Sequence, residues 1–259
     1  MNKIVKYILA TFTAAAIIAY LLMTFVFVDN KKQAVICKDI KISIDDDDQY
    51  PFIEIKDIKY VLLHSGEKII GEQLDKINKY KLKQILSKNN AIKSINIFTT
   101  IDANLNVEIT QRRPVLRVQC HNARFYIDDS GYMFPLLPKP NLNVPIVTGV
   151  MTSVPANGFT GYISKTESGK FLNQLYEFAV FLKDDTFWNN MIEQINVTNN
   201  KIEIIPQIAE HIVKLGSLDN FRLKLNKLQK FYKNAMPAIG WDKYKIINIE
   251  YKNQIICKK

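Results

Sequence analysis

The hydrophobic residues in the first half of the chain follow two spacings, and their order predicts a small α+β domain. Residues 34–44 alternate with period two, which is typical of a strand. Apolar residues at helical spacing follow at residues 55–65 and 79–90, and alternation returns at residues 91–101 and 104–113. This order predicts a three-stranded sheet with both helices on one face, because that arrangement buries the apolar side of every element.

Residues 114–259 predict a second domain of mostly antiparallel strands with flanking helices. Two strands are expected around a tight turn at residues 128–131, because an Asp-Asp-Ser-Gly sequence favours turns. A helix is expected over residues 167–183, and three strands within residues 191–216. A last helix with an apolar stripe follows and ends at Pro237. The whole chain is therefore expected to be α+β.

The chain finishes on a further alternating segment, residues 247–256. Ile247, Ile249 and Tyr251 are expected to face one side of a single strand, with polar residues between them. A terminal strand leaves one row of backbone N–H and C=O groups unpaired unless a neighbour covers it. The pattern therefore predicts either an internal partner for this strand or an edge that another molecule can complete.

A long apolar segment near the N-terminus predicts a membrane anchor. Residues 7–28 contain no charged residue, and a helix needs about 20 apolar residues to cross a bilayer core. Residues 25–29 make a poor signal-peptide cleavage site, so we interpret the segment as uncleaved. Residues 1–6 would form a cytoplasmic stub, with the remaining chain outside the cytoplasm. This placement argues against nucleic acid as the target of the net charge of +10.

The residue types that carry catalysis and metal binding are sparse. Cys37, Cys120 and Cys257 lack any paired spacing, which makes a zinc site improbable. They are interpreted as packed residues, although one of three possible pairs could bridge in an oxidising compartment. None of the three histidines has a metal-ligand spacing, and no catalytic or phosphate-binding motif is found. We therefore expect no metal, no cofactor and no enzyme.

Several charged clusters are interpreted as structural or solvated. Asp45–Asp48 is expected to form a solvated loop, because the spaced ligands of an EF-hand are missing. The neighbouring carboxylates Asp128 and Asp129 belong to the expected turn rather than to an acid–base pair. Arg112 and Arg113 are interpreted as an exposed corner. A solvated helix face is the default interpretation of lysines that recur every three residues in the last helix, over a specific surface for an anionic partner: Lys224, Lys227, Lys230 and Lys233.

The order of elements resembles the bacterial cell-division family FtsQ, called DivIB in some lineages. The likeness is carried by residues 104–118, 125–136, 144–149 and 213–232, and by an ending similar to that of the Bacteroidetes-type branch. The resemblance implies a transmembrane helix at residues 7–28. It also implies a POTRA domain at residues 29–113 and a C-terminal β domain at residues 114–259.

The family resemblance also implies a function. Such proteins are non-enzymatic divisome scaffolds at the septum. They link early and late division proteins and control septal peptidoglycan synthesis by binding an FtsB/FtsL-like pair. They are single-pass inner-membrane proteins with a periplasmic bulk, and the POTRA domain would contact other divisome proteins. A partner segment adds to the last β-strand.

Carried over by position, the docking residues form one continuous stretch of the last segment. They are Ile249, Glu250, Tyr251, Lys252, Asn253, Gln254 and Ile255. Tyr251 stands where the family has a tyrosine. Glu250 stands where the family has an arginine, which puts the family's salt bridge in doubt and allows a reversed charge preference.

Two other functional classes fit parts of the pattern. A POTRA-bearing secretion or outer-membrane assembly component would show several POTRA units or a membrane barrel after them. A membrane-anchored periplasmic hydrolase would need a catalytic cluster in a cleft. The sequence offers neither feature, so the scaffold interpretation is preferred.

Overall fold

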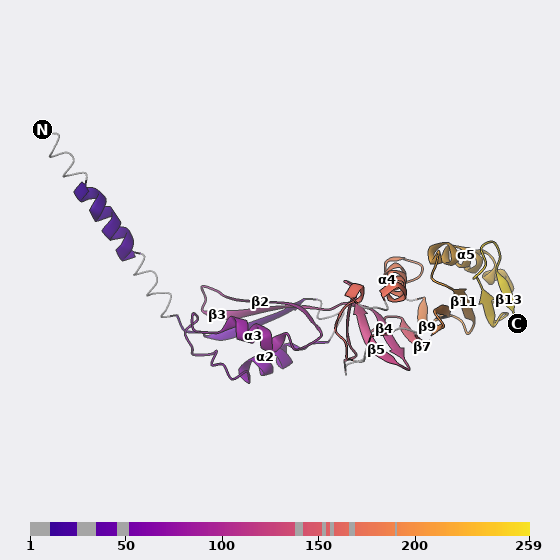
Figure 1. The fold of residues 1–259 in the computed structure, drawn as a ribbon, viewed down its shortest axis with the longest axis horizontal. Helices are drawn as coiled ribbons and strands as arrows, with labels where there is room; N and C mark the ends of the chain where they lie inside the picture. The colour runs from indigo at the N-terminus through magenta and orange to yellow at the C-terminus, as the bar shows by residue number, and fades with distance from the viewer. Residues whose placement is uncertain are drawn as a thin grey trace, which may run out of the picture. The chain divides into compact units, whose positions relative to one another are not determined.

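The structure of the protein is a computed structural model. Its chain divides into two compact units, and the boundary in the sequence lies between Gln111 and Arg112. The boundary expected from the sequence lies two residues further along the chain. Each unit is considered by itself (Figure 1). The structure describes residues 11–24, 35–45, 52–137, 142–151, 154–155, 158–165, 169–189 and 191–259.

The first unit has the predicted strand–helix–helix–strand–strand order. Its elements are β1 (Asp39–Asp45), α2 (Ile55–Leu63), α3 (Lys79–Leu86), β2 (Ile92–Thr99) and β3 (Asn104–Gln111). The sheet order is β1-β3-β2, with β1 parallel to β3 and β2 antiparallel to it. The two helices lie beside each other against this sheet (Figure 1). The expected small α+β domain is therefore confirmed.

Both helices of the first unit bury one stripe each. Ile58 and Leu62 of α2 are buried, as are Leu82 and Leu86 of α3. The side chain of Asn78 caps α3, because its amide oxygen accepts a hydrogen bond from the Lys81 N–H at 3.0 Å. The spacing of apolar residues thus fixes which helix face meets the sheet.

The N-terminal helix covers residues 11–24, and its side chains are almost all exposed. Among the described parts of the chain, no helix combines the length and apolar character needed to span a bilayer. Residues 7–10 and 25–28 of the expected anchor, the expected stub at residues 1–6, and residues 46–48 of the aspartate run lie outside the described residues.

The second unit is built on one ten-stranded mixed sheet, in the order β13-β12-β11-β10-β9-β7-β4-β5-β6-β8. The pairs β11–β12, β4–β7 and β7–β9 are parallel, and the other neighbours are antiparallel. The bounds of the strands are β4 (Pro114–Cys120), β5 (Ala123–Asp128), β6 (Tyr132–Pro135), β7 (Ile146–Val150), β8 (Gly161–Tyr162), β9 (Ile192–Thr198), β10 (Lys201–Pro206), β11 (Ile212–Gly216), β12 (Ile246–Asn248) and β13 (Ile256–Lys258).

Helices pack on this sheet around one hydrophobic core. They are α4 (Gly169–Asp184), α5 (Phe221–Asn234), the short α6 (Met236–Ile239) and a 3-10 turn, η1 (Ile163–Lys165). Both long helices lie on the same side of the strands (Figure 1). Phe178 of α4 meets Phe221 of α5 edge to face, with ring centroids 5.2 Å apart. Both long helices direct an apolar stripe into this core, as the sequence predicted for the last helix.

A buried aspartate organises the turn between β5 and β6. Asp128 is fully buried, and its carboxylate accepts bonds from Arg112 Nη1 at 2.8 Å and from the Ser130 N–H and hydroxyl at 2.9 and 2.6 Å. It also accepts the Tyr132 N–H at 2.9 Å. The turn interpretation is confirmed. Arg112 is not the exposed corner that was expected, because its guanidinium lies 3.7 Å from the centre of the Tyr132 ring.

We expect Asp128→Ala to lower the free energy of unfolding by about 3 kcal/mol, because it removes a buried ion pair together with three bonds to the turn. Ser130→Ala removes only one of these bonds and should cost about 1 kcal/mol. Urea unfolding of both variants measures the difference. Equal losses would contradict an organising role for Asp128.

Candidate partner-binding site

The last segment of the chain is a hairpin and not one strand. β12 pairs in parallel with β11 on one side and antiparallel with β13 on the other. The single strand expected over residues 247–256 is therefore wrong, and the chain itself covers both edges of β12. Residues 249–255, the predicted docking residues, form the loop that joins β12 to β13.

These seven residues divide into a packed part and an exposed part. Ile249 is fully buried, and its N–H donates to Lys214 O at 3.0 Å. Glu250 and Ile255 are half-buried, and Ile255 packs against the hydrophobic core. Tyr251 is 48% exposed. Lys252, Asn253 and Gln254 are also exposed, so the predicted set presents four side chains to solvent.

A lysine of α5 holds this loop in place. The Lys227 ammonium donates to the carbonyl oxygens of Ile249 at 3.2 Å, of Gln254 at 3.0 Å and of Tyr251. Desolvation by burial, together with the charge of Lys224, lowers the pKa of Lys227. One side chain therefore satisfies three carbonyl groups that a ladder would otherwise have to pair.

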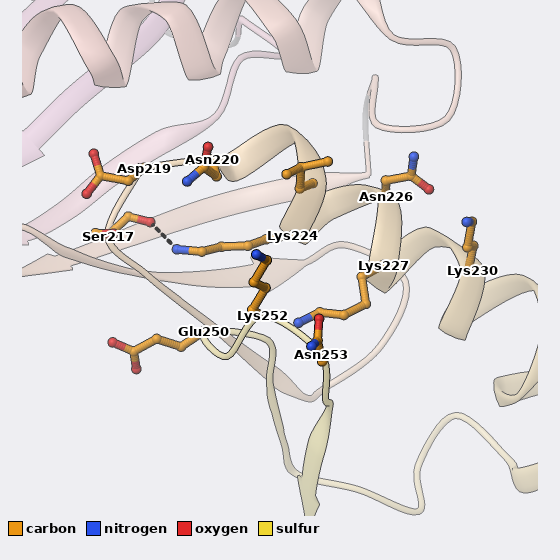
Figure 2. Close-up of a pocket in the computed structure, with 11 residues that line it drawn as sticks. Ser217, Asp219, Asn220, Lys224, Asn226, Lys227, Lys230, Glu250, Lys252 and Asn253 are labelled. Atoms are coloured by element: carbon orange, nitrogen blue, oxygen red, sulfur yellow. Dashed lines mark hydrogen bonds between the residues drawn. The ribbon is translucent and has the colours of Figure 1, made fainter.

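A second lysine of α5, Lys224, also binds backbone carbonyl groups. The Lys224 ammonium donates to Leu215 O at 3.1 Å and to Ser217 O at 2.8 Å, and Figure 2 shows it pointing towards Ser217. Burial also lowers the pKa of Lys224. A solvated face was thus the wrong interpretation for Lys224 and Lys227. Their spacing placed them on one face, but no sequence signal identified the carbonyl groups they meet.

The position of Glu250 depends on a glycine. Gly216 ends β11 with a φ of 73°, and a Cβ atom there would stand 2.7 Å from the Glu250 side chain. The Glu250 carboxylate accepts a bond from Lys201 Nζ at 3.4 Å. An acidic side chain at this position is therefore built into the unit by a close backbone approach and a local ion pair.

A groove of about 690 Å³ runs between α5 and the β12–β13 loop (Figure 2). Leu223 of α5 is the apolar residue of its lining, and it is 69% exposed. Sequence reasoning missed Leu223, because it lies off the buried stripe of its helix. The groove is lined by Ser217, Asp219, Asn220, Leu223, Lys224, Asn226, Lys227, Lys230, Glu250, Lys252 and Asn253.

β13 is the strand at one edge of the sheet, and no strand lies beyond it among the described residues. The parallel ladder with β11 uses the backbone groups of Ile247. Successive residues of a strand point their N–H and C=O groups to opposite sides, so the two neighbours of Ile247 face β13. They pair there with the two neighbours of Cys257. The N–H and C=O groups of Cys257 therefore point away from the sheet.

The remaining chemistry-bearing residues pack into the fold. Cys37 and Cys120 are buried, Cys257 is half-buried, and all three thiols are free. Burial raises the pKa of Cys120 to about 11. Within the ranges that the structure describes, no three His, Cys, Asp or Glu side chains gather as metal ligands would. His211 is buried, and its Nε2 atom lies 2.5 Å from the Tyr232 hydroxyl.

Comparison with known proteins agrees with the resemblance inferred from the sequence. A family model described as FtsQ/DivIB, C-terminal related, matches residues 113–258, and a POTRA-like domain model matches residues 35–110. The cell division protein FtsQ of Geotalea daltonii (strain DSM 22248 / JCM 15807 / FRC-32) is 26% identical over 200 residues. That alignment covers 76% of this chain and 67% of the Geotalea protein.

We expect Lys227→Met to free the β12–β13 loop and to lower the free energy of unfolding by about 1–2 kcal/mol, because three carbonyl groups lose a charged donor. Amide hydrogen exchange of Ile256 and Lys258, which follow the loop and pair with β12, should become faster. Lys230→Met is the matched control, since Lys230 lies one turn later on α5 and is exposed. Unchanged exchange in Lys227→Met would show that the loop does not depend on this side chain.

The buried His211 predicts a pH dependence of stability. Burial lowers its pKa below the ordinary 6.5, and its Nδ1 atom finds no hydrogen-bond partner among the described residues. As the pH falls, His211 is protonated in the unfolded chain at a higher pH than in the folded chain. The free energy of unfolding is therefore highest above pH 6.5 and decreases as the pH falls towards the lowered pKa. Urea unfolding at several pH values should show this loss. His211→Gln should give a flatter profile, and an equally steep one would assign the effect to other groups.

Proposed function

Since the chain belongs to the FtsQ/DivIB-related family of cell-division proteins, we propose that it is a non-enzymatic scaffold of the division septum. In this role it links early and late division proteins and controls septal peptidoglycan synthesis by binding an FtsB/FtsL-like pair. The two-unit organisation supports the proposal, because a POTRA-like unit precedes the family's C-terminal unit.

The proposed location is the inner membrane at midcell. Residues 7–28 serve as a single-pass anchor in this proposal, because their sequence is long and apolar enough to cross a bilayer core. Residues 1–6 then lie in the cytoplasm, and both units lie in the periplasm. The POTRA unit is available for other divisome proteins.

Partner binding is proposed to occur by strand addition to β13. The observation that carries this is the outward-facing N–H and C=O of Cys257 on the last strand of the sheet. Backbone groups at such an edge are what an added strand pairs with. The loop before β13 supplies side-chain contacts, with Tyr251, Lys252, Asn253 and Gln254 exposed beside Ile256. Ile249, Glu250 and Ile255 position this loop from within.

Strand addition can be tested by one backbone change. We expect Cys257→Pro to weaken co-purification of an FtsB/FtsL-like pair at least about tenfold, because proline removes the outward N–H and its ring blocks the incoming strand. The strand's own ladder to β12 is kept, since Cys257 contributes no bond to it. Cys257→Ala is the matched control and should bind normally.

A second pair of measurements separates loss of binding from loss of folding. Ile256→Pro removes an N–H that faces β12 and should lower stability, whereas Cys257→Pro should unfold near the wild-type midpoint. A fluorescent fusion of the whole chain should form a midcell band. Normal capture of the pair by Cys257→Pro would reject strand addition, and a uniform envelope signal would reject the septal role.

A further inference from the structure

The groove beside α5 is large enough to hold several side chains. Its volume of about 690 Å³ lies within the roughly 300–1,000 Å³ of sites that enclose a drug-sized ligand. One wall is α5, and the other is the β12–β13 loop with Glu250, Lys252 and Asn253 (Figure 2). A groove of this size can take several side chains of a polypeptide segment.

The lining of the groove carries more positive than negative charge. The lining contains two acids, Asp219 and Glu250, and four lysines: Lys224, Lys227, Lys230 and Lys252.

Both acids have neighbours outside the lining. Asp219 accepts a bond from Gln174 of α4 at 3.1 Å, and Glu250 is paired with Lys201 of β10. Lys224 and Lys227 donate to backbone carbonyl groups. These groups carry no net charge, so the positive charge of both lysines remains. The groove is therefore positive, and a negatively charged ligand complements it.

The two remaining lysines are the ones that a ligand can reach. Lys230 and Lys252 are exposed, one on each wall of the groove. The amide side chains of Asn226 and Asn253 are exposed beside them. Together they offer charged and neutral donors from both walls, which suits carboxylate and backbone carbonyl acceptors on an inserted segment.

An apolar contact distinguishes this groove from a simple anion site. Leu223 is 69% exposed, although the other leucines of α5 are buried in the core. It stands on the groove wall one position before Lys224 and seven before Lys230. A ligand that covers it gains apolar burial in addition to charge contacts. The lining therefore favours carboxylates together with an apolar side chain.

The loop wall of the groove is held in place before any ligand arrives. Lys227 binds three of its carbonyl groups, and the Glu250 side chain is packed against Gly216. A ligand then does not have to order this wall, which lowers the entropic cost of binding. The groove is thus suited to a defined segment rather than to diffuse attraction.

We propose that this groove docks an acidic segment of a partner protein, with carboxylates meeting Lys230 and Lys252 and an apolar side chain covering Leu223. The inference rests on the proposed scaffold function for the existence of a partner. It goes beyond that function by assigning a second contact, made by side chains, next to the strand edge of β13. The chemistry of the docking segment is therefore acidic and amphipathic.

The test uses the whole 259-residue chain and synthetic peptides of about a dozen residues. A labelled peptide that repeats Glu-Glu-Leu should bind in fluorescence anisotropy, and binding should weaken as salt rises. The corresponding Lys-Lys-Leu peptide should not bind. Lys230→Glu/Lys252→Glu should bind the acidic peptide about tenfold less tightly, because each reversal replaces an attraction with a repulsion. Lys243→Glu/Lys245→Glu is the charge-matched control outside the groove and should bind nearly normally.

The apolar contact is measured separately. Leu223→Ser should weaken binding of the Glu-Glu-Leu peptide and leave that of a Glu-Glu-Ser peptide unchanged, because only the former covers Leu223. Unaltered binding of the Glu-Glu-Leu peptide to the double lysine variant would overturn the proposal. So would binding of phosphatidylglycerol vesicles through Lys230 and Lys252 without binding of the acidic peptide, since the surface would then be a membrane contact.

Cys257→Pro keeps the two proposals apart. Cys257 does not line the groove, so this variant should bind the acidic peptide as the wild type does. Loss of peptide binding in Cys257→Pro would contradict the assignment to the groove. Normal capture of the division pair by Cys257→Pro, with peptide binding still dependent on Lys230 and Lys252, would reject strand addition and leave the groove in place.

Discussion

The C-terminal surface of this protein depends on one ammonium group. Lys227 donates to three carbonyl oxygens of the β12–β13 loop, and this loop is the connection that returns the chain along β12. Backbone carbonyl groups that leave a ladder need other partners, and a charged donor on a neighbouring helix supplies them at one point. The same contact fixes one wall of the groove and holds the loop that leads into β13. Groove and edge therefore share a structural cause.

Much of the architecture follows from local sequence. Alternation with period two located the three strands of the first unit and several strands of the second. The paired asparagines after β9 take the left-handed conformation of a hairpin turn, with φ angles of 51° and 58°. The buried Asp128 was recognised as a turn residue from the Asp-Asp-Ser-Gly sequence. These features were predictable because each is decided by residues close together in the chain.

The features that escaped prediction are decided by distant residues. Alternation continues through Tyr251, but the pairing of β12 ends at Asn248, and Lys227 of the distant helix α5 binds the carbonyl groups that follow. Arg112 was expected at an exposed corner, but it forms an ion pair with Asp128, which lies sixteen positions later in the sequence. The spacing of the α5 lysines placed them on one helix face without indicating what that face meets. Long side chains with tertiary partners were thus the weak point of sequence reasoning.

The return of β13 changes how a partner can use this sheet. An added strand would meet only a short edge that ends in Lys258, and short, charged edges normally discourage pairing between sheets. Backbone bonds alone would then give modest affinity and little selectivity. Side-chain contacts from the neighbouring loop and groove can supply both, because charge complementarity selects partners and apolar burial at Leu223 adds binding energy. A short edge beside a preformed, positively charged groove thus gives a physical route to specific binding without a long exposed strand.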